Sequence, residues 1–440
     1  MSSSSRSAAP TAPPAPSRER KPVLQAGRAR SAIVMVLAVV ASLGGAQVAH
    51  SSNWDFNPRV ELAGVFNDNY RLAQDSAGKV RADGAMLDAS LGMRLLTQTS
   101  EISLVPRVTS SYFPNDTSDD STNGYLDFKG NHKLQKGQYG VDAQYANEEV
   151  IFSELLPANF PGVGLGQVVG SESGRVTALN RRELERVAPT MTYDLTQRYH
   201  LHLDAEYLHA SYDKNLFEQV GFQNFEARAG LGYDISQQTT FLGSLIGTRY
   251  EPHDSLATNG YGVQTELQFH PTQIMSYYFR LGALHSQANV PGGSVSSTSV
   301  TGGAGMTWTY QITQVVVDAL RSVSPSSAGQ VQNHNELRFR VIRALKPRLS
   351  GFVGARAIRL RSAVGGPLAV QGSDYLAATT GLEYQLTRSY RLAGEYDYTW
   401  QRFQGEPRAA SNSVMVSIIY QPLSRFEPVP DLNGIPQQRH

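Results

Sequence analysis

A unit the length of one β-hairpin repeats along most of this chain, and each copy contains a short turn. The best-formed copy runs from Asp374 to Phe403, where two stretches of alternating apolar and polar residues flank the turn Leu386-Thr-Arg-Ser389. Because side chains of a strand point alternately to its two faces, each stretch has one apolar and one polar face. Similar short turns occur at 97–100, 133–137, 193–197, 233–237, 269–273, 310–314, 344–348 and 384–388. This repeat predicts a sheet of long antiparallel strands.

Longer connections alternate strictly with the short turns. They lie at 71–82, 114–122, 152–179, 213–219, 252–258, 287–298, 324–331, 362–372 and 404–411. Nine long and eight short connections imply eighteen strands, with both chain ends on the short-turn side. An even strand number with short turns at one rim and long loops at the other is typical of outer-membrane barrels. We therefore predict an all-β fold, a transmembrane antiparallel up-and-down β-barrel of about 18 strands (16–18) over residues 58–421. Its short turns are expected to be periplasmic and its long loops extracellular.

Composition excludes several other classes of protein. The mean hydropathy of −0.31 and the single helix-like apolar run argue against a multi-span helical membrane protein. The formal net charge of +1 gives no basic surface for nucleic acid, so no nucleic-acid partner is expected. The absence of cysteine excludes disulfides and thiolate metal sites. A soluble propeller would need four strands per repeat, and a packed soluble barrel would not tolerate the charge on the polar strand faces.

Both chain ends differ in composition from the repeats. Residues 1–30 are rich in Ser, Ala, Pro and Arg and are predicted to be disordered; one hypothesis is that translation begins near Val23. Residues 31–49 are predicted to form a signal peptide core and cleavage region, with Arg28 and Arg30 as its charged flank. A transmembrane anchor is the alternative, but the apolar run is short for the ~20 residues of a span. Residues 50–57 are predicted to be a periplasmic segment, and residues 422–440 a Pro-rich tail.

Aromatic residues cluster at both ends of the predicted strands, as in the interfacial girdles of membrane barrels. The predicted partners are therefore outer-membrane lipid and lipopolysaccharide. Those near the short turns are Tyr193, Tyr199, Tyr233, Phe241, Phe269, Tyr277, Tyr310, Tyr384 and Tyr390. Those near the long loops are Tyr112, Phe113, Tyr125, Tyr212, Tyr250, Tyr261, Tyr375, Trp400 and Phe403.

Charged residues on the polar faces are the candidates for lining a lumen. They are Arg338, Arg340, Arg359, Arg361, Glu383, Glu395, Asp397, Glu266 and Glu206. Basic and acidic walls would select solutes by charge, whereas ordinary lumen polarity would not. The Gly-rich loop 152–179 either folds inward and constricts the lumen or stays exposed.

The opening FNPRVELAGVFNDNYRL (56–72), the repeated hairpins and the closing NSVMVSIIYQP (412–422) resemble a family of bacterial outer-membrane β-barrel proteins. Members are porin-like in fold, and some are encoded beside exopolysaccharide export or exosortase systems. The resemblance covers most of the mature chain and implies the bacterial outer membrane as location. It supplies no catalytic residues. Tyr420 resembles the final aromatic residue that the barrel-assembly machinery recognises, although here the chain continues beyond it.

The favoured function is a porin-like barrel that passes or binds solutes or exported polysaccharide through a polar lumen. The alternative is a non-conducting structural or accessory barrel in cell-envelope or exopolysaccharide assembly. A third reading is an enzyme, because His209-Ala-Ser211 resembles the His-x-Ser of outer-membrane phospholipases. Tyr212 and Asp213 replace the Asn-Gly expected after that Ser. We therefore predict no enzyme activity, no cofactor and no metal site; the acidic loop 114–122 lacks EF-hand spacing for Ca²⁺.

Overall fold

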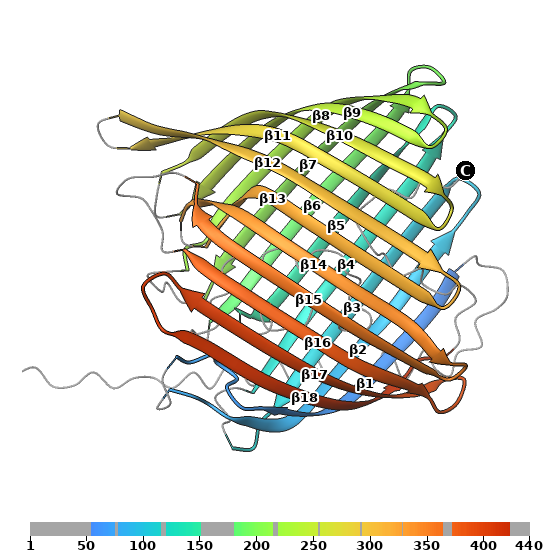
Figure 1. Cartoon of the computed structure of the whole chain (residues 1–440), viewed down its shortest axis with the longest axis vertical. Coiled ribbons are helices and arrows are strands. Elements are labelled where there is room, and N and C mark those ends of the chain that lie inside the picture. The colour runs from blue at the N-terminus through green and yellow to red at the C-terminus, as the bar shows by residue number, and fades with distance from the viewer. Residues whose placement is uncertain are drawn as a thin grey trace, which may run out of the picture. The chain divides into compact units, whose positions relative to one another are not determined.

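The computed structural model describes residues 54–74, 78–115, 120–150, 180–213, 219–253, 256–290, 293–327, 329–363 and 372–422. The regular elements of these ranges are eighteen β-strands (Figure 1). In this part of the chain, no helix has the length and apolarity needed to cross a membrane. The strands are β1 (Trp54–Asn67), β2 (Ala82–Leu96), β3 (Ser100–Tyr112), β4 (Ser121–Leu134), β5 (Gly137–Glu149), β6 (Arg181–Asp194), β7 (Tyr199–Tyr212), β8 (Phe222–Ser236), β9 (Thr239–Pro252), β10 (Thr258–Thr272), β11 (Met275–Val290), β12 (Gly293–Tyr310), β13 (Thr313–Pro325), β14 (Val331–Lys346), β15 (Leu349–Ser362), β16 (Ser373–Gln385), β17 (Tyr390–Phe403) and β18 (Arg408–Tyr420).

The strands form one closed antiparallel sheet. Each strand pairs with its neighbours in the sequence, and β1 also pairs with β18, from Val60 opposite Tyr420 to Asn67 opposite Ser413. Figure 1 shows this closure, where the red strand β18 lies beside the blue strand β1. The predicted antiparallel barrel of about 18 strands is confirmed.

The two faces of the sheet differ in exposure and in chemistry. Leu245 of β9 is 66 % exposed and Leu281 of β11 is 64 % exposed, whereas Glu61 of β1 and Asp88 of β2 are each 1 % exposed. In a sheet closed on itself, the charged and buried face lines the lumen and the apolar face lies outside. An apolar outer surface of this kind suits contact with lipid chains.

A threonine hydroxyl closes several of the short turns. Thr196 Oγ1 accepts a hydrogen bond from the backbone N–H of Tyr199 at 3.1 Å, and Thr387 Oγ1 accepts one from Tyr390 N–H at 3.1 Å. The hydroxyl thereby satisfies an N–H group inside the turn. The Thr that recurs in these turns therefore has a local structural role.

The first strand begins at Trp54 rather than near Pro58. Residues 54–57, predicted to be a periplasmic segment, pair with β2 opposite Leu95 to Gly92. Asn57 and Pro58 are poor strand formers, so the sequence alone shows no strand there. The neighbouring strand β2 supplies the pairing that local preference does not.

The stretch 287–298 is not the loop that we predicted from its Gly and Ser content. β11 continues to Val290, and Ser294–Ser299 of β12 pair with Leu284–Asn289 of β11. Residues 294–299 are Ser and Thr with one Val, and such residues make acceptable strand residues when a partner strand lies alongside.

The aromatic residues near the short turns lie on the outer face, and Tyr199 and Tyr310 are among the exposed ones. The girdle predicted near the long loops is only partly right. Tyr112 and Tyr261 are exposed there at 57 % and 62 %, but other members of the predicted set face the interior. The buried members are Phe113, Tyr250, Tyr375 and Phe403. These rings pack inside the long-loop end of the barrel because their strand register places them on the lumen face.

Candidate functional site

The lumen face of β10 and β11 begins a continuous set of polar contacts. Glu266 of β10 accepts hydrogen bonds from Gln268 Nε2 at 2.9 Å and from Arg280 Nε of β11 at 2.8 Å. The Arg280 guanidinium also lies over the Tyr278 ring, 5.6 Å from its centroid. Glu266 therefore lies on the lumen face, with its charge compensated by Arg280.

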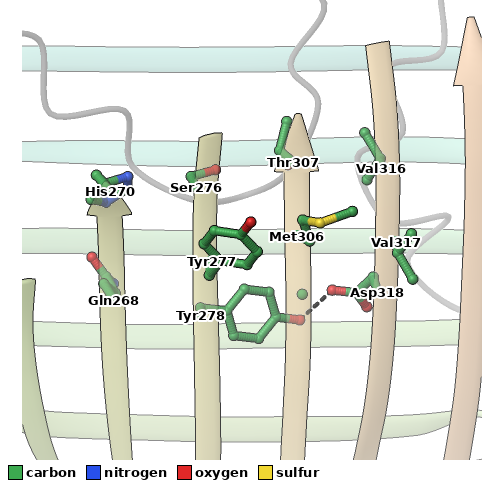
Figure 2. A pocket seen from close by; sticks show the side chains of 11 residues that line it. Gln268, His270, Ser276, Tyr277, Tyr278, Met306, Thr307, Val316, Val317 and Asp318 are labelled. Atoms are coloured by element: carbon green, nitrogen blue, oxygen red, sulfur yellow. Dashed lines mark hydrogen bonds between the residues drawn. The ribbon is translucent and has the colours of Figure 1, made fainter. Parts of the chain in front are cut away.

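Tyr278 continues these contacts across β12. Figure 2 shows its ring reaching from β11 to β13, where the hydroxyl donates a hydrogen bond to Asp318 Oδ2. The ring lies over Gly305 of β12, and a Cβ atom at Gly305 would lie 2.1 Å from Tyr278 Cε1. The Tyr278 ring can therefore lie at this position only because Gly305 has no side chain.

Glu336 of β14 is the centre of the next group. Asp318 stands directly opposite Arg338 in the ladder between β13 and β14. Arg338 Nε and Arg356 Nε of β15 each donate a hydrogen bond to Glu336 Oε1 at 2.6 Å. The Glu336 side chain is only 1 % exposed. Two guanidinium groups, rather than water, therefore compensate its charge.

Arg340 lies two residues after Arg338, on the same face of β14. It stands opposite Val316 of β13 and Gly354 of β15 and forms no ion pair within the described ranges. The other lumen-facing arginines of the described strands do form ion pairs: Arg59, Arg94, Arg107, Arg182, Arg186, Arg228, Arg280, Arg338, Arg356 and Arg391. Arg340 thus presents to the lumen a positive charge that no direct ion pair holds, with Glu395 as the carboxylate that acts on it from a distance.

The acidic candidates of β16 and β17 lie on the same wall. Glu383 Oε1 accepts a hydrogen bond from Arg391 Nη1 at 2.8 Å. Glu395 Oε1 accepts one from Thr379 Oγ1 at 3.4 Å, and Asp397 lies two residues further on the same face. The basic strands β14 and β15 and the acidic strands β16 and β17 are therefore neighbours in the ring.

Glu206 belongs to a second set of lumen contacts, on β6 to β8. Its Oε2 accepts a hydrogen bond from Arg186 Nε of β6 at 2.9 Å. Beside it, Glu226 Oε1 of β8 accepts one from Arg228 Nη2 at 2.9 Å. Paired charges are thus present on the lumen wall of β6–β8 as well as on that of β10–β17.

We predicted that Arg359 and Arg361 line the lumen, but they do not. They lie on the outer face of β15, with 65 % and 40 % of their side chains exposed. Both donate hydrogen bonds to Asp374 of β16, at 3.0 and 2.9 Å.

A bulge in the turn between β14 and β15 explains this error. Lys346 pairs with Leu349, but the next pair joins Ala344 to Ser350, so Leu345 is an extra residue. A shift of one residue exchanges the two faces of the strand that follows. The bulge brings Arg356 opposite Arg338, and sequence alternation missed it because β15 has apolar residues on both faces.

The loop between β13 and β14 reaches across the long-loop end of the barrel. Tyr250 Oη of β9 donates a hydrogen bond to Ser326 O at 2.6 Å, and Val220 N–H donates one to Ser327 O at 2.7 Å. Three strands separate β9 from β13 in the ring. An apolar cluster accompanies this contact and contains Ala146, Leu184, Leu208, Ala210, Phe222, Tyr250, Val331 and Ala363. The two alternatives for loop 152–179, folding inward or staying exposed, concern residues outside the described ranges, whereas the 326–327 contact crosses the long-loop end within them.

His209 and Ser211 share the outer face of β7, as their spacing predicts. No hydrogen bond joins the two side chains in the structure as described, and His209 Nδ1 is buried without a hydrogen-bond partner. A serine hydrolase needs the base to contact the nucleophile. The geometry therefore shows no assembled nucleophile and base at this position.

No protein-family model and no curated protein matches the sequence. Among solved structures, the chain is similar to Pseudomonas aeruginosa OccK2 (OpdF) in complex with glucuronate, at 11 % identity over 84 % of this chain and 99 % of that chain, with a TM-score of 0.43. It is similar to Pseudomonas aeruginosa OpdK with vanillate at 10 % identity over 84 % and 99 %, with a TM-score of 0.43. The ferric-catecholate import receptor Fiu from E. coli K12 matches at 9 % identity over 86 % and 82 %, with a TM-score of 0.40. Similarity at this level does not specify a solute.

Proposed function

We propose that this chain is an outer-membrane β-barrel protein of the porin type, which passes polar solutes through its lumen. The observation that carries this proposal is the closed ring of eighteen strands with an apolar outer face and a charged inner face. Rings of about 16–18 strands are wide enough to enclose an aqueous channel. In such barrels the short turns face the periplasm and the long loops face the outside.

The lumen wall of β14 and β15 supports a preference for anionic solutes. Arg340 forms no direct ion pair with a carboxylate of the described residues, and Arg338 and Arg356 lie beside it. A positive group inside a narrow, low-dielectric passage attracts anions and raises their local concentration. A solute carrying a carboxylate or phosphate would contact Arg340 most favourably.

Conductance of the refolded protein in planar bilayers tests both the open channel and its preference for anions. We expect stepwise currents whose reversal potential in a salt gradient shows anion preference. Arg340→Gln should lower the anion-to-cation permeability ratio by about twofold, since one lumen charge is removed. Arg343→Gln, on the outer face of the same strand, should leave the ratio unchanged. Absence of current steps from folded protein would reject the open pore, and an unchanged ratio in Arg340→Gln would reject the role of Arg340.

A non-conducting accessory barrel is the second candidate. The hydrogen bond from Tyr250 to Ser326 and the apolar cluster around it favour this reading, because they narrow the long-loop end. The same bilayer measurement separates the two candidates. Folded protein that inserts but stays silent, also after the contact is removed, supports the accessory barrel.

Passage of exported polysaccharide is the narrower form of the channel proposal. The lumen face of β12 supports it, because its side chains are small and carry hydroxyls that can hydrogen-bond to sugars: Ser297, Ser299, Thr301 and Thr307. Addition of soluble acidic oligosaccharides to one side of the bilayer should then interrupt the current. Currents that are insensitive to such oligosaccharides would reject this form of the proposal.

A further inference from the structure

Four arginines gather on the outer face of β15–β18, at the long-loop end of the barrel. We call this group the arginine cluster; it consists of Arg359, Arg361, Arg402 and Arg408, with Asp374 among them. Arg359 stands opposite Asp374, Asp374 opposite Arg402, and Arg402 opposite Arg408 in successive ladders. At a strand spacing of about 4.8 Å, this row extends about 14 Å over four adjacent strands.

Asp374 cannot neutralise the arginine cluster. Its carboxylate accepts hydrogen bonds from Arg359 Nε at 3.0 Å, Arg361 Nη2 at 2.9 Å and Arg402 Nη2 at 3.0 Å. Arg408 forms no ion pair with any residue that the structure describes. Four positive groups and one negative group leave a formal charge of +3 (4 − 1).

Two of these positive charges face each other directly. Arg402 and Arg408 are cross-strand partners on the outer face. Like charges in this position destabilise a sheet. An anion placed between the two guanidinium groups would remove this repulsion.

The surroundings of the arginine cluster are those of a membrane surface. The Arg359 and Arg402 side chains are 65 % and 54 % exposed, so both are open to a ligand from outside the barrel. Trp400 lies 5.9 Å below the Arg402 guanidinium and stands opposite the exposed Leu376. Tryptophan at the edge of an apolar belt marks the level of lipid headgroups.

Two other outward arginines near the long-loop end each pair with one carboxylate. Arg81 Nε donates to Asp83 at 2.9 Å, and Arg249 Nε donates to Glu251 at 2.6 Å. These pairs are as exposed as the arginine cluster but carry no net charge. The gathering of four arginines around one carboxylate distinguishes the β15–β18 sector from these two pairs.

We propose that the arginine cluster binds the phosphate groups of lipopolysaccharide in the leaflet that surrounds the long-loop end. Guanidinium groups recognise phosphate by paired, charge-assisted hydrogen bonds. The arginines form two pairs on either side of Asp374, which suits a lipid that carries two phosphates. This inference rests on the outer-membrane location in the proposed function, but it does not depend on conduction.

Binding of lipopolysaccharide to the full-length protein in detergent tests this proposal by native mass spectrometry. The probes are purified lipopolysaccharide and the same material after enzymatic dephosphorylation. Removal of the two facing positive charges in Arg402→Gln/Arg408→Gln should weaken binding of the phosphorylated form at least about tenfold. Arg249→Gln, an equally exposed outer arginine, should bind like the wild type. Dephosphorylated lipopolysaccharide should bind no more tightly to the wild type than to the double variant.

Three results would overturn the proposal. They are equal binding by the double variant, equal binding of dephosphorylated lipopolysaccharide, and displacement by inorganic phosphate or phosphatidylglycerol at matching concentrations. The double variant should still resist SDS at room temperature, which shows that it is folded. The double variant should still give unchanged current steps. A failure of lipid binding is then distinct from a failure of the proposed channel.

Discussion

At the scale of single residues, the lumen wall depends on a match between a glycine and a ring. Tyr278 lies over Gly305 and donates a hydrogen bond to Asp318, so one tyrosine connects β11 and β13 across β12. Gly305→Ala should push the ring away and leave Asp318 without this donor. Loss of this partly buried hydrogen bond to a charged group should cost about 1–3 kcal/mol, and we expect that decrease in unfolding free energy from urea titration.

A double-mutant cycle gives the control for this prediction. In a Tyr278→Ala background the ring is absent, so Gly305→Ala should then cost close to nothing. Gly247→Ala, where a Cβ atom meets nothing within 4 Å, should be neutral in both backgrounds. An equal cost of Gly305→Ala with and without Tyr278 would show that the ring is not the reason for the glycine.

At the scale of elements, the least extensive pairing is the seam that closes the barrel. β1 pairs with β18 over eight residues but with β2 over fourteen. Side chains following β1 extend the seam: Asn69 Nδ2 donates to Ala410 O at 2.9 Å, and Asp68 Oδ2 accepts from Asn412 Nδ2 at 2.7 Å. The Asn-Asp-Asn-Tyr sequence at 67–70 is thus a clamp at the point of closure.

Removal of this clamp should weaken closure more than the rest of the sheet. Asn69 is 1 % exposed and also bonds the backbone of Ala73, so Asn69→Ala leaves partly buried backbone groups without these partners. We expect a loss of about 1–3 kcal/mol, measured as a lower temperature at which the folded form in SDS gels converts to the unfolded form. Asn259→Ala, an exposed position on β10, is the matched control. Equal conversion temperatures for Asn69→Ala and wild type would refute the clamp.

At the scale of the whole molecule, residues far apart in the ring meet at the long-loop end. Tyr250 of β9 holds the loop after β13 through Ser326 O, and both residues are buried. Tyr250→Phe removes the hydroxyl donor but keeps the ring in the apolar cluster. The loop should then move away from the lumen more often, and the mean single-channel conductance should rise.

Tyr261→Phe is the control for this measurement, because Tyr261 lies on the outer face and is 62 % exposed. Its conductance should equal that of the wild type. A Tyr250→Phe protein with wild-type conductance would mean that the loop contact does not limit the current. The effect on stability should be small, about 1 kcal/mol for one neutral hydrogen bond.

Part of the candidate site could be read from local alternation. Glu266, Glu383 and Glu395 lie on the lumen face, because each strand there has one clearly apolar and one clearly polar face. Arg359 and Arg361 could not be placed in this way. The face of β15 on which they lie depends on one extra residue in the preceding turn, and β15 carries apolar side chains on both faces.

The amino-acid sequence by itself determined the strands, their number and the positions of the short turns, since alternation and turn chemistry act between residues close in the chain. Tertiary structure alone decided which arginines face the lumen, which one lacks a partner and which gather outside. It also decided that the loop after β13 meets Tyr250 and that some of the aromatic rings near the long loops, such as Tyr375 and Phe403, turn inward. These features depend on the register of neighbouring strands and on closure of the ring, which bring together residues that no local pattern connects.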